Sequence, residues 1–181
     1  MYFLAKLGVI AGALGFVFYL LAALLSARIP GLDVRFGGLT KVWRIHHLLG
    51  AAAFLLLLAH PLLLAFAAGS PRAASAILFP GPGAWQVWTG WTALAAMAAF
   101  LAPTFEFFGP PEYQRWKSLH ALSGLALVLG AVHAVALSRS LPGAVWAGGA
   151  ALALAAFVYR VLIAPAVGRE RYSIVKVDAI T

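Results

Sequence analysis

Five long apolar segments, separated by short stretches rich in glycine and proline, run along the chain. They cover residues 2–27, 42–68, 84–102, 113–137 and 143–164. A helix needs about 20 mostly apolar residues to span a bilayer, so each segment predicts a transmembrane helix. The first segment is also too long for the apolar core of a signal peptide. The pattern therefore predicts an all-α membrane protein, a bundle of five transmembrane helices.

The stretches between these segments have the composition of loops. Residues 28–41 and 69–83 carry several glycines and prolines, and both are predicted as irregular connections. Pro61 lies inside the second predicted helix and predicts a kink there. In the first helix, glycines recur on the side that could meet a neighbouring helix, and they predict close packing: Gly8, Gly12 and Gly15.

Composition supports the membrane assignment. Hydrophobic residues make up 64% of the 181 residues and charged residues 10%, which is too little polar surface to cover a soluble globule. Cysteine is absent. This excludes disulfides, thiolate-held iron–sulfur clusters and thioether-linked haem, so a metal cofactor would depend on histidine.

The net charge of +8 comes from basic residues scattered singly between apolar segments, which argues for membrane orientation and against nucleic-acid binding. With the amino terminus outside, three of the 13 basic residues lie outside: Lys6, Arg72 and Arg139. The other ten then lie inside. The bias predicts a multi-pass protein of a plasma membrane with a cytoplasmic carboxyl terminus.

All five histidines lie in the second and fourth predicted helices: His46, His47, His60, His120 and His133. Ionisable side chains in hydrocarbon are costly and usually face a functional partner inside the bundle. His46 and His60 are about 21 Å apart along a helix and nearly on one face. His120 and His133 would point about 140° apart on a straight helix. They serve two cofactors only if these lie on different flanks or the helix is distorted.

Pairing by depth predicts two haem b groups between helices two and four. His46 with His120 would hold one iron, and His60 with His133 the other. Iron with two histidine ligands has no open coordination position, so the predicted function is electron transfer. A different hypothesis treats the histidines as titrating groups of a proton-conducting protein.

Residues near the first pair have two interpretations each. Arg44, Arg115 and Lys117 lie where haem propionates would emerge, but they also fit basic anchors at the membrane interface. Gly50 and Gly124, each four residues after a histidine, would let a porphyrin approach the backbone or let helices pack closely.

The first ligand is ambiguous between His46 and its neighbour His47. The pattern W-[RK]-x-x-H-x12-H describes both histidine helices, from Trp43 to His60 and again in the fourth helix, and it favours His47. Facial geometry favours His46, because a spacing of 14 residues is closer to whole turns than 13.

Residues 171–181 alternate apolar and polar side chains around β-branched residues, which predicts a strand. A single strand needs a sheet to pair with. We expect this tail to begin a cytoplasmic β-domain, either cut off from this chain or supplied by a partner subunit.

With these residues in view, the chain resembles the ferric reductase-like transmembrane domain. NADPH oxidases, ferric reductases and the haem subunit of the bacterial methionine sulfoxide reductase system share this domain. Its first histidine helix has the form H-[RK]-x-x-G, with a second histidine 14 positions on and often a proline next. His46, Gly50, His60 and Pro61 match this form, with His47 in place of the basic residue. The resemblance therefore favours His46 over His47.

The resemblance implies a haem-binding domain over residues 1–165 and, in residues 166–181, the first strand of a missing FAD-binding domain. In such an oxidoreductase, electrons pass from a cytoplasmic NAD(P)H and FAD dehydrogenase domain or subunit to the inner haem. They continue through the outer haem to an acceptor such as oxygen or ferric iron. A bacterial plasma membrane is the implied location. Leu64 stands where oxidases carry a further histidine, which weakens oxygen as the acceptor.

The same domain in a methionine sulfoxide reductase system implies a second function, that of a quinol-linked haem subunit with a periplasmic partner. The predicted strand at residues 171–181 argues against that alternative.

Overall fold

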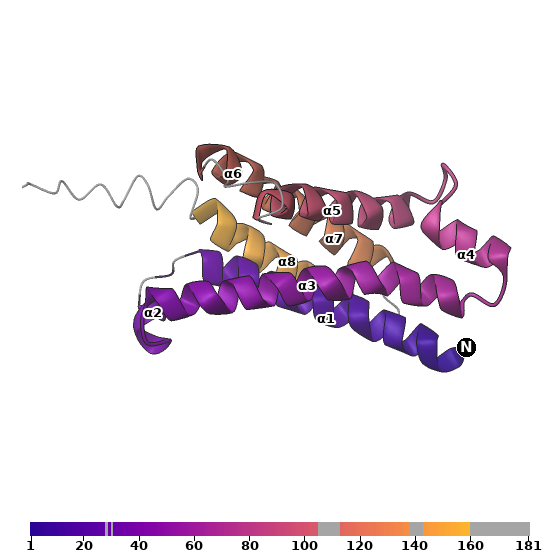
Figure 1. Cartoon of the computed structure of the whole chain (residues 1–181), viewed down its shortest axis with the longest axis horizontal. Coiled ribbons are helices and arrows are strands. Elements are labelled where there is room, and N and C mark those ends of the chain that lie inside the picture. Colours follow the sequence, from indigo (N-terminus) through magenta and orange to yellow (C-terminus); the bar gives the residue numbers. More distant parts are fainter. Residues whose placement is uncertain (28, 30, 105–112, 138–142, 160–181) are drawn as a thin grey trace, which may run out of the picture.

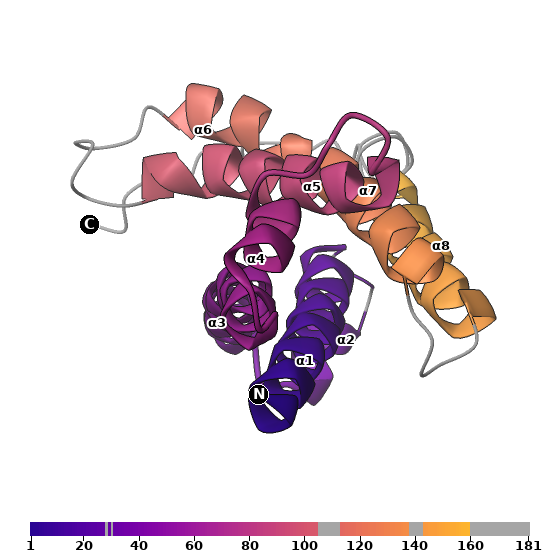
Figure 2. The same ribbon diagram turned by 90° about the vertical axis from the view of Figure 1, so that its right-hand side faces the viewer.

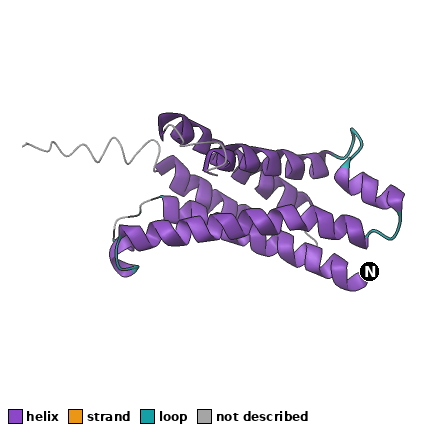
Figure 3. Cartoon of the chain, viewed as in Figure 1, coloured by secondary structure: helices purple, strands orange, loops and turns teal. Residues whose placement is uncertain are grey.

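Helices form in all five apolar segments, and the described part of the chain contains no strand (Figures 1 and 3). The computed structural model describes residues 1–27, 29, 31–104, 113–137 and 143–159. In chain order the elements are α1 (Tyr2–Ser26), α2 (Leu32–Arg35), α3 (Leu39–Ala67), α4 (Pro71–Leu78), α5 (Trp85–Leu101), the 3-10 turn η1 (Ala102–Thr104), α6 (Tyr113–His120), α7 (Leu122–Leu137) and α8 (Gly143–Val158).

Three helical stretches are long and apolar enough to cross a membrane: Tyr2–Ser26, Leu39–Ala67 and Ser118–Leu137. They make the chain a multi-pass membrane protein. Helix α8 is apolar but shorter in its described part. A five-helix transmembrane bundle, in which α5 and α8 also cross, stays a prediction.

The long helices lie side by side, with α1 packed along α3, α5 along α7, and α8 against both α7 and α1 (Figures 1 and 2). The glycines predicted to allow close packing lie at the α1–α3 contact. A Cβ atom added to Gly8 would lie 2.9 Å from Leu64 Cδ2, and one added to Gly15 would lie 2.9 Å from Leu57 Cγ. Glycine at these positions therefore lets the two helices approach each other.

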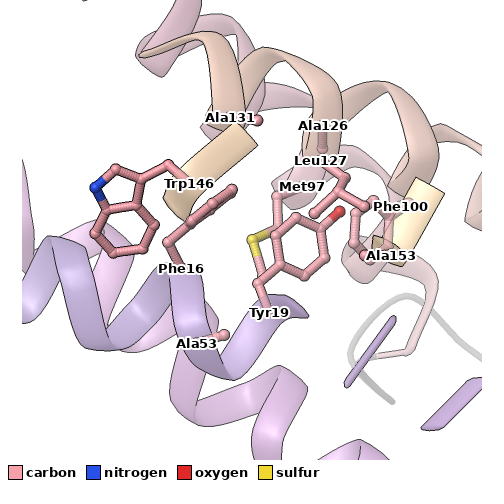
Figure 4. Packing of buried hydrophobic residues seen from close by; sticks show 10 residues of the cluster. All are labelled: Phe16, Tyr19, Ala53, Met97, Phe100, Ala126, Leu127, Ala131, Trp146 and Ala153. Carbon is pink, nitrogen blue, oxygen red and sulfur yellow. The ribbon is translucent and has the colours of Figure 1, made fainter. Parts of the chain in front are cut away.

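A core of aromatic and small residues fills the centre of the bundle (Figure 4). Phe16 on α1 meets Trp146 on α8 edge to face at 5.7 Å, and Tyr19 stacks on Phe100 of α5 at 6.5 Å. The remaining members come from α3, α5, α7 and α8: Ala53, Met97, Ala126, Leu127, Ala131 and Ala153. This core joins the two helix pairs into one body.

Both predicted irregular connections contain helix, so that part of the prediction was wrong. Ser70 caps α4, because its side chain accepts a hydrogen bond from Ala73 N at 3.2 Å and Pro71 takes the first helical position. In the other connection, Gly31 with φ of 80° precedes the single turn of α2. A serine followed by a proline is a common start of a helix. The several prolines of residues 69–83 instead suggested a loop.

The fourth predicted helix is interrupted by a turn at Ala121, directly after His120. Ala121 N bonds Ser118 O and Gly124 N bonds Ala121 O, both at 3.2 Å and both across three residues. Such tight bonds change the rotation per residue from that of an α-helix. The tail at residues 171–181 and the end of the fifth predicted helix lie outside the described residues.

Leu127 in the core gives a test of the packing. It is 2% exposed, whereas Leu125 on the same helix is 51% exposed. We expect Leu127→Ala to lower the free energy of unfolding by about 2–5 kcal/mol, because it opens a cavity. Leu125→Ala is the matched control and should change stability little. Thermal unfolding of the purified protein in detergent measures both, and equal losses would contradict the described core.

Candidate functional site

Four histidines form two pairs that join α3 to the α6–α7 segment. The ring centres of His46 and His120 are 6.3 Å apart, and those of His60 and His133 are 6.2 Å apart. The planes in the pairs are inclined at 62° and 81°. These are the residues that the sequence pairs by depth. His46 lies in the half of α3 that follows α2, and His60 lies in the half that precedes α4.

The turn at Ala121 explains how one chain segment supplies a partner to each end of α3. A straight helix would turn His120 and His133 about 140° apart. Helix α6 ends at His120, and α7 begins after the turn. The angle between the two side chains therefore differs from that on one straight helix. The sequence predicts that the helix must be distorted if His120 and His133 serve sites on one side, and the turn at Ala121 is such a distortion.

Three of the paired rings are held at Nδ1 by carbonyl groups of a neighbouring helix. Helix α1 holds both α3 histidines, and α5 holds the α7 histidine. The distances from Nδ1 to oxygen are 2.9 Å for His46 and Ala22, 2.8 Å for His60 and Gly8, and 2.7 Å for His133 and Gln86. A carbonyl only accepts, so Nδ1 donates and carries the proton. The Nε2 atom of each ring then keeps its lone pair, as in histidine metal ligands.

The carbonyl groups are what sequence reasoning missed. They are backbone atoms of α1 and α5, and no pattern of side chains in α3 or α7 reveals them.

Aromatic rings surround His120. Trp116 stacks on it at 4.9 Å and Phe100 meets it edge to face at 5.1 Å. His47, by contrast, is exposed, and its ring lies 5.2 Å from that of Trp43. Of the two neighbouring histidines on α3, His46 is therefore the one whose ring faces His120.

A cavity of about 500 Å³ lies at the second pair, with His60 and His133 in its walls. Its other walls are largely apolar and come from α1, α3, α4, α5, α7 and α8, with Trp91, Met97 and Tyr19 among them. Cofactor sites have volumes of about 300–1,000 Å³ and such apolar walls with few polar groups. The two imidazoles are the side chains in this lining that could ligate a metal.

The residues predicted to surround a haem at the first pair differ in their exposure and in the space beside them. Arg44 is exposed on α3. Arg115 and Lys117 belong to α6, but their side chains lie outside the described part. A Cβ atom on Gly50 would meet nothing within 4 Å, whereas one on Gly124 would lie 3.1 Å from the Phe157 ring. Gly124 thus serves helix packing, and Gly50 leaves space beside α3.

A family model described as ferric reductase like transmembrane component matches residues 11–131, more than half of the chain. The matched range includes His46, His60 and His120. Neither the search of curated proteins nor that of solved structures gave a match.

The carbonyl contacts predict one tautomer for three histidines. We expect His46, His60 and His133 to carry the proton on Nδ1, because each bonds a carbonyl oxygen through that atom. Nitrogen-15 NMR of histidine-labelled protein without cofactor measures this, with signals assigned by single His→Gln variants. Exposed His47 is the internal control, and a proton on Nε2 of any of the three would contradict the geometry.

Proposed function

The chain belongs to the ferric reductase-like transmembrane family, and on this premise we propose that it carries electrons across a membrane through two haem b groups. His46 and His120 hold one haem, and His60 and His133 hold the other. The family implies oxidoreductase activity in general. The haems, their ligands and the direction of transfer are our proposal.

The spacing within the histidine pairs is the observation that carries the proposal. Two imidazoles on opposite sides of one metal ion place their ring centres about 6.2 Å apart, from a metal–nitrogen bond of about 2.0 Å and a further 1.1 Å, roughly, to each ring centre. The two pairs have ring centres 6.3 and 6.2 Å apart. Both separations thus fit one ion between two imidazoles.

The remaining features of the pairs fit a haem better than a bare ion. Among the described residues no group of three or more His, Cys, Asp or Glu side chains lies together as a metal site. Each pair would therefore hold a haem through two imidazoles, and the porphyrin would supply the other nitrogen ligands. The apolar cavity at the second pair is of cofactor size.

One-electron exchange is the chemistry that a haem supplies when bound here. Two imidazoles would hold each haem, so the residues of the two sites would favour electron transfer over oxygen binding at iron. The central core lies between the pairs, which are about 21 Å apart along α3. No charged side chain is buried in the described part, so this layer is largely apolar.

The distribution of basic residues supports a direction. With the amino terminus outside, the pair His46–His120 lies on the cytoplasmic side, where Arg44, Arg115 and Lys117 would bind propionates. A cytoplasmic dehydrogenase domain or subunit carrying FAD and NAD(P)H then donates electrons to this site. The acceptor, oxygen or ferric iron, is reached from the pair His60–His133 at the opposite membrane face.

The haem content of purified protein tests the proposal. We expect a b-type spectrum with about two haems per chain after expression with ample haem, because each pair supplies both axial ligands. His133→Ala should remove about one haem and leave the other. Absorbance per protein, with haem extracted and counted separately, measures both. Wild-type protein without a Soret band would refute the proposal.

A matched pair of variants separates the neighbouring histidines of α3. His46→Ala should lose the haem of the first pair, because its ring faces His120. His47→Ala should keep full haem content, because its ring is exposed beside Trp43. Equal losses in the two variants would sink the assignment of His46.

The electron donor is tested with the protein in vesicles. We expect the haems to be reduced by NAD(P)H when a flavodehydrogenase domain is supplied, and not by a quinol analogue. The reverse result would favour a quinol-linked subunit of a methionine sulfoxide reductase system. Proton conduction by haem-free protein in liposomes would instead favour the proton-relay hypothesis. Haem absorbance and an internal pH dye are the two measurements.

A further inference from the structure

His60 and His133 are held by the same backbone arrangement on two different helices. We call it a glycine seat: a carbonyl bonds Nδ1 of the ring, and the residue four positions later is glycine. His60 Nδ1 bonds the carbonyl of Gly8 at 2.8 Å. Four residues further along α1, Gly12 lies against the same ring, and a Cβ atom there would be 2.6 Å from Nδ1. The ring thus occupies the space of the missing side chain.

The second seat repeats this arrangement on α5. His133 Nδ1 bonds the carbonyl of Gln86 at 2.7 Å. Four residues later stands Gly90, where a Cβ atom would again be 2.6 Å from Nδ1. Helices α1 and α5 differ in sequence, yet each presents a carbonyl followed by glycine after four residues.

Helix geometry explains the spacing. The Cα–Cβ bond tilts toward the helix amino terminus, so a side chain covers the turn before it. The residue four positions after a carbonyl therefore covers that carbonyl. Glycine uncovers the second lone pair of an oxygen that already accepts the helical N–H. A methyl group at 2.6 Å from Nδ1 would force the ring away from its hydrogen bond.

The seat of His46 shows that such a glycine is not a general requirement. His46 Nδ1 bonds the carbonyl of Ala22 at 2.9 Å, and the residue four positions later is Ser26. The Ser26 hydroxyl donates to Ala23 O at 2.7 Å. A side chain is therefore accommodated beside His46, and the glycine seats belong to the pair His60–His133.

We propose that Gly12 and Gly90 are positioning residues for the haem between His60 and His133. This rests on the proposed function. By uncovering the two carbonyls, the glycines fix the ring orientations and keep the Nδ1–H bonds that raise ligand basicity. A more basic imidazole donates more to ferric iron and lowers the reduction potential of that haem. Weakening these bonds raises the potential or releases the haem.

The test compares Gly12→Ala and Gly90→Ala in the full chain with two matched controls. Gly15→Ala adds a methyl group at another tight position of α1, 2.9 Å from Leu57 Cγ, where no histidine lies. Gly148→Ala adds one on α8 where nothing lies within 4 Å. The two seats lie on different helices, so each variant tests the proposal independently if the other does not fold.

Potentiometric titration and electron paramagnetic resonance of the oxidised protein are the readouts. We expect each seat variant to raise the potential of one haem, or to weaken its binding by about 10- to 100-fold, and to leave the other haem unchanged. The low-spin signal of the affected haem should shift, because ring orientation changes. Gly15→Ala and Gly148→Ala should keep both signals and both potentials.

Two results would overturn the proposal. One is unchanged potentials and spectra in both seat variants. The other is the same shift of potential and spectrum in Gly15→Ala, because it would show that the effect comes from helix packing and not from the glycine beside the histidine. Wild-type protein without haem would instead overturn the proposed function. Nitrogen-15 NMR of the histidines still tests the seat in that case, because Gly12→Ala should move the His60 signals and Gly15→Ala should not.

Discussion

An imidazole placed among apolar helices must satisfy both ring nitrogens, and this constraint organises the bundle. For His46, His60 and His133 the first nitrogen is satisfied by a carbonyl of the adjacent helix. A buried polar group without such a partner is costly in a membrane. The contact requires α1 to lie close to α3, and α5 close to α7. The second nitrogen of each ring then keeps its lone pair, as in histidine metal ligands.

The packing of the bundle keeps α1 close to α3 and α5 close to α7. Glycines on α1 bring the helix against α3, where Gly8 also supplies its carbonyl to His60. The central core then joins the α1–α3 pair to the α5–α7 pair. Its contacts across the bundle include the bond from the Tyr19 hydroxyl to Ser123 O at 2.6 Å, just beyond the turn at Ala121. The residues that stabilise the fold thus lie between the sites and separate them.

Much of this arrangement follows from the sequence alone. Apolar length predicts the helices, and the spacing of His46 and His60 predicts two sites at different depths on α3. Helix α4 was missed because the proline of its first turn was interpreted as a loop residue. The angle between His120 and His133 indicated a distortion of the fourth helix, but its sequence does not mark Ala121 as the position of the turn. The carbonyl partners could not be predicted, because the sequence does not indicate which backbone groups a histidine side chain contacts.

The two histidine pairs have the same residue types and nearly the same spacing, but they differ in their surroundings. His60 and His133 border an apolar cavity and rest in glycine seats on two helices. His120 lies among the rings of Trp116 and Phe100, and His46 rests beside Ser26 on a single helix. Hydrogen bonding to the ligands and the apolarity of the shell are what tune a haem potential when the axial ligands are the same. With haem in both sites, as proposed, these differences would give the two irons unequal potentials. Unequal potentials would favour transfer in one direction across the membrane, and under the proposed function they would arise from the helices behind the histidines.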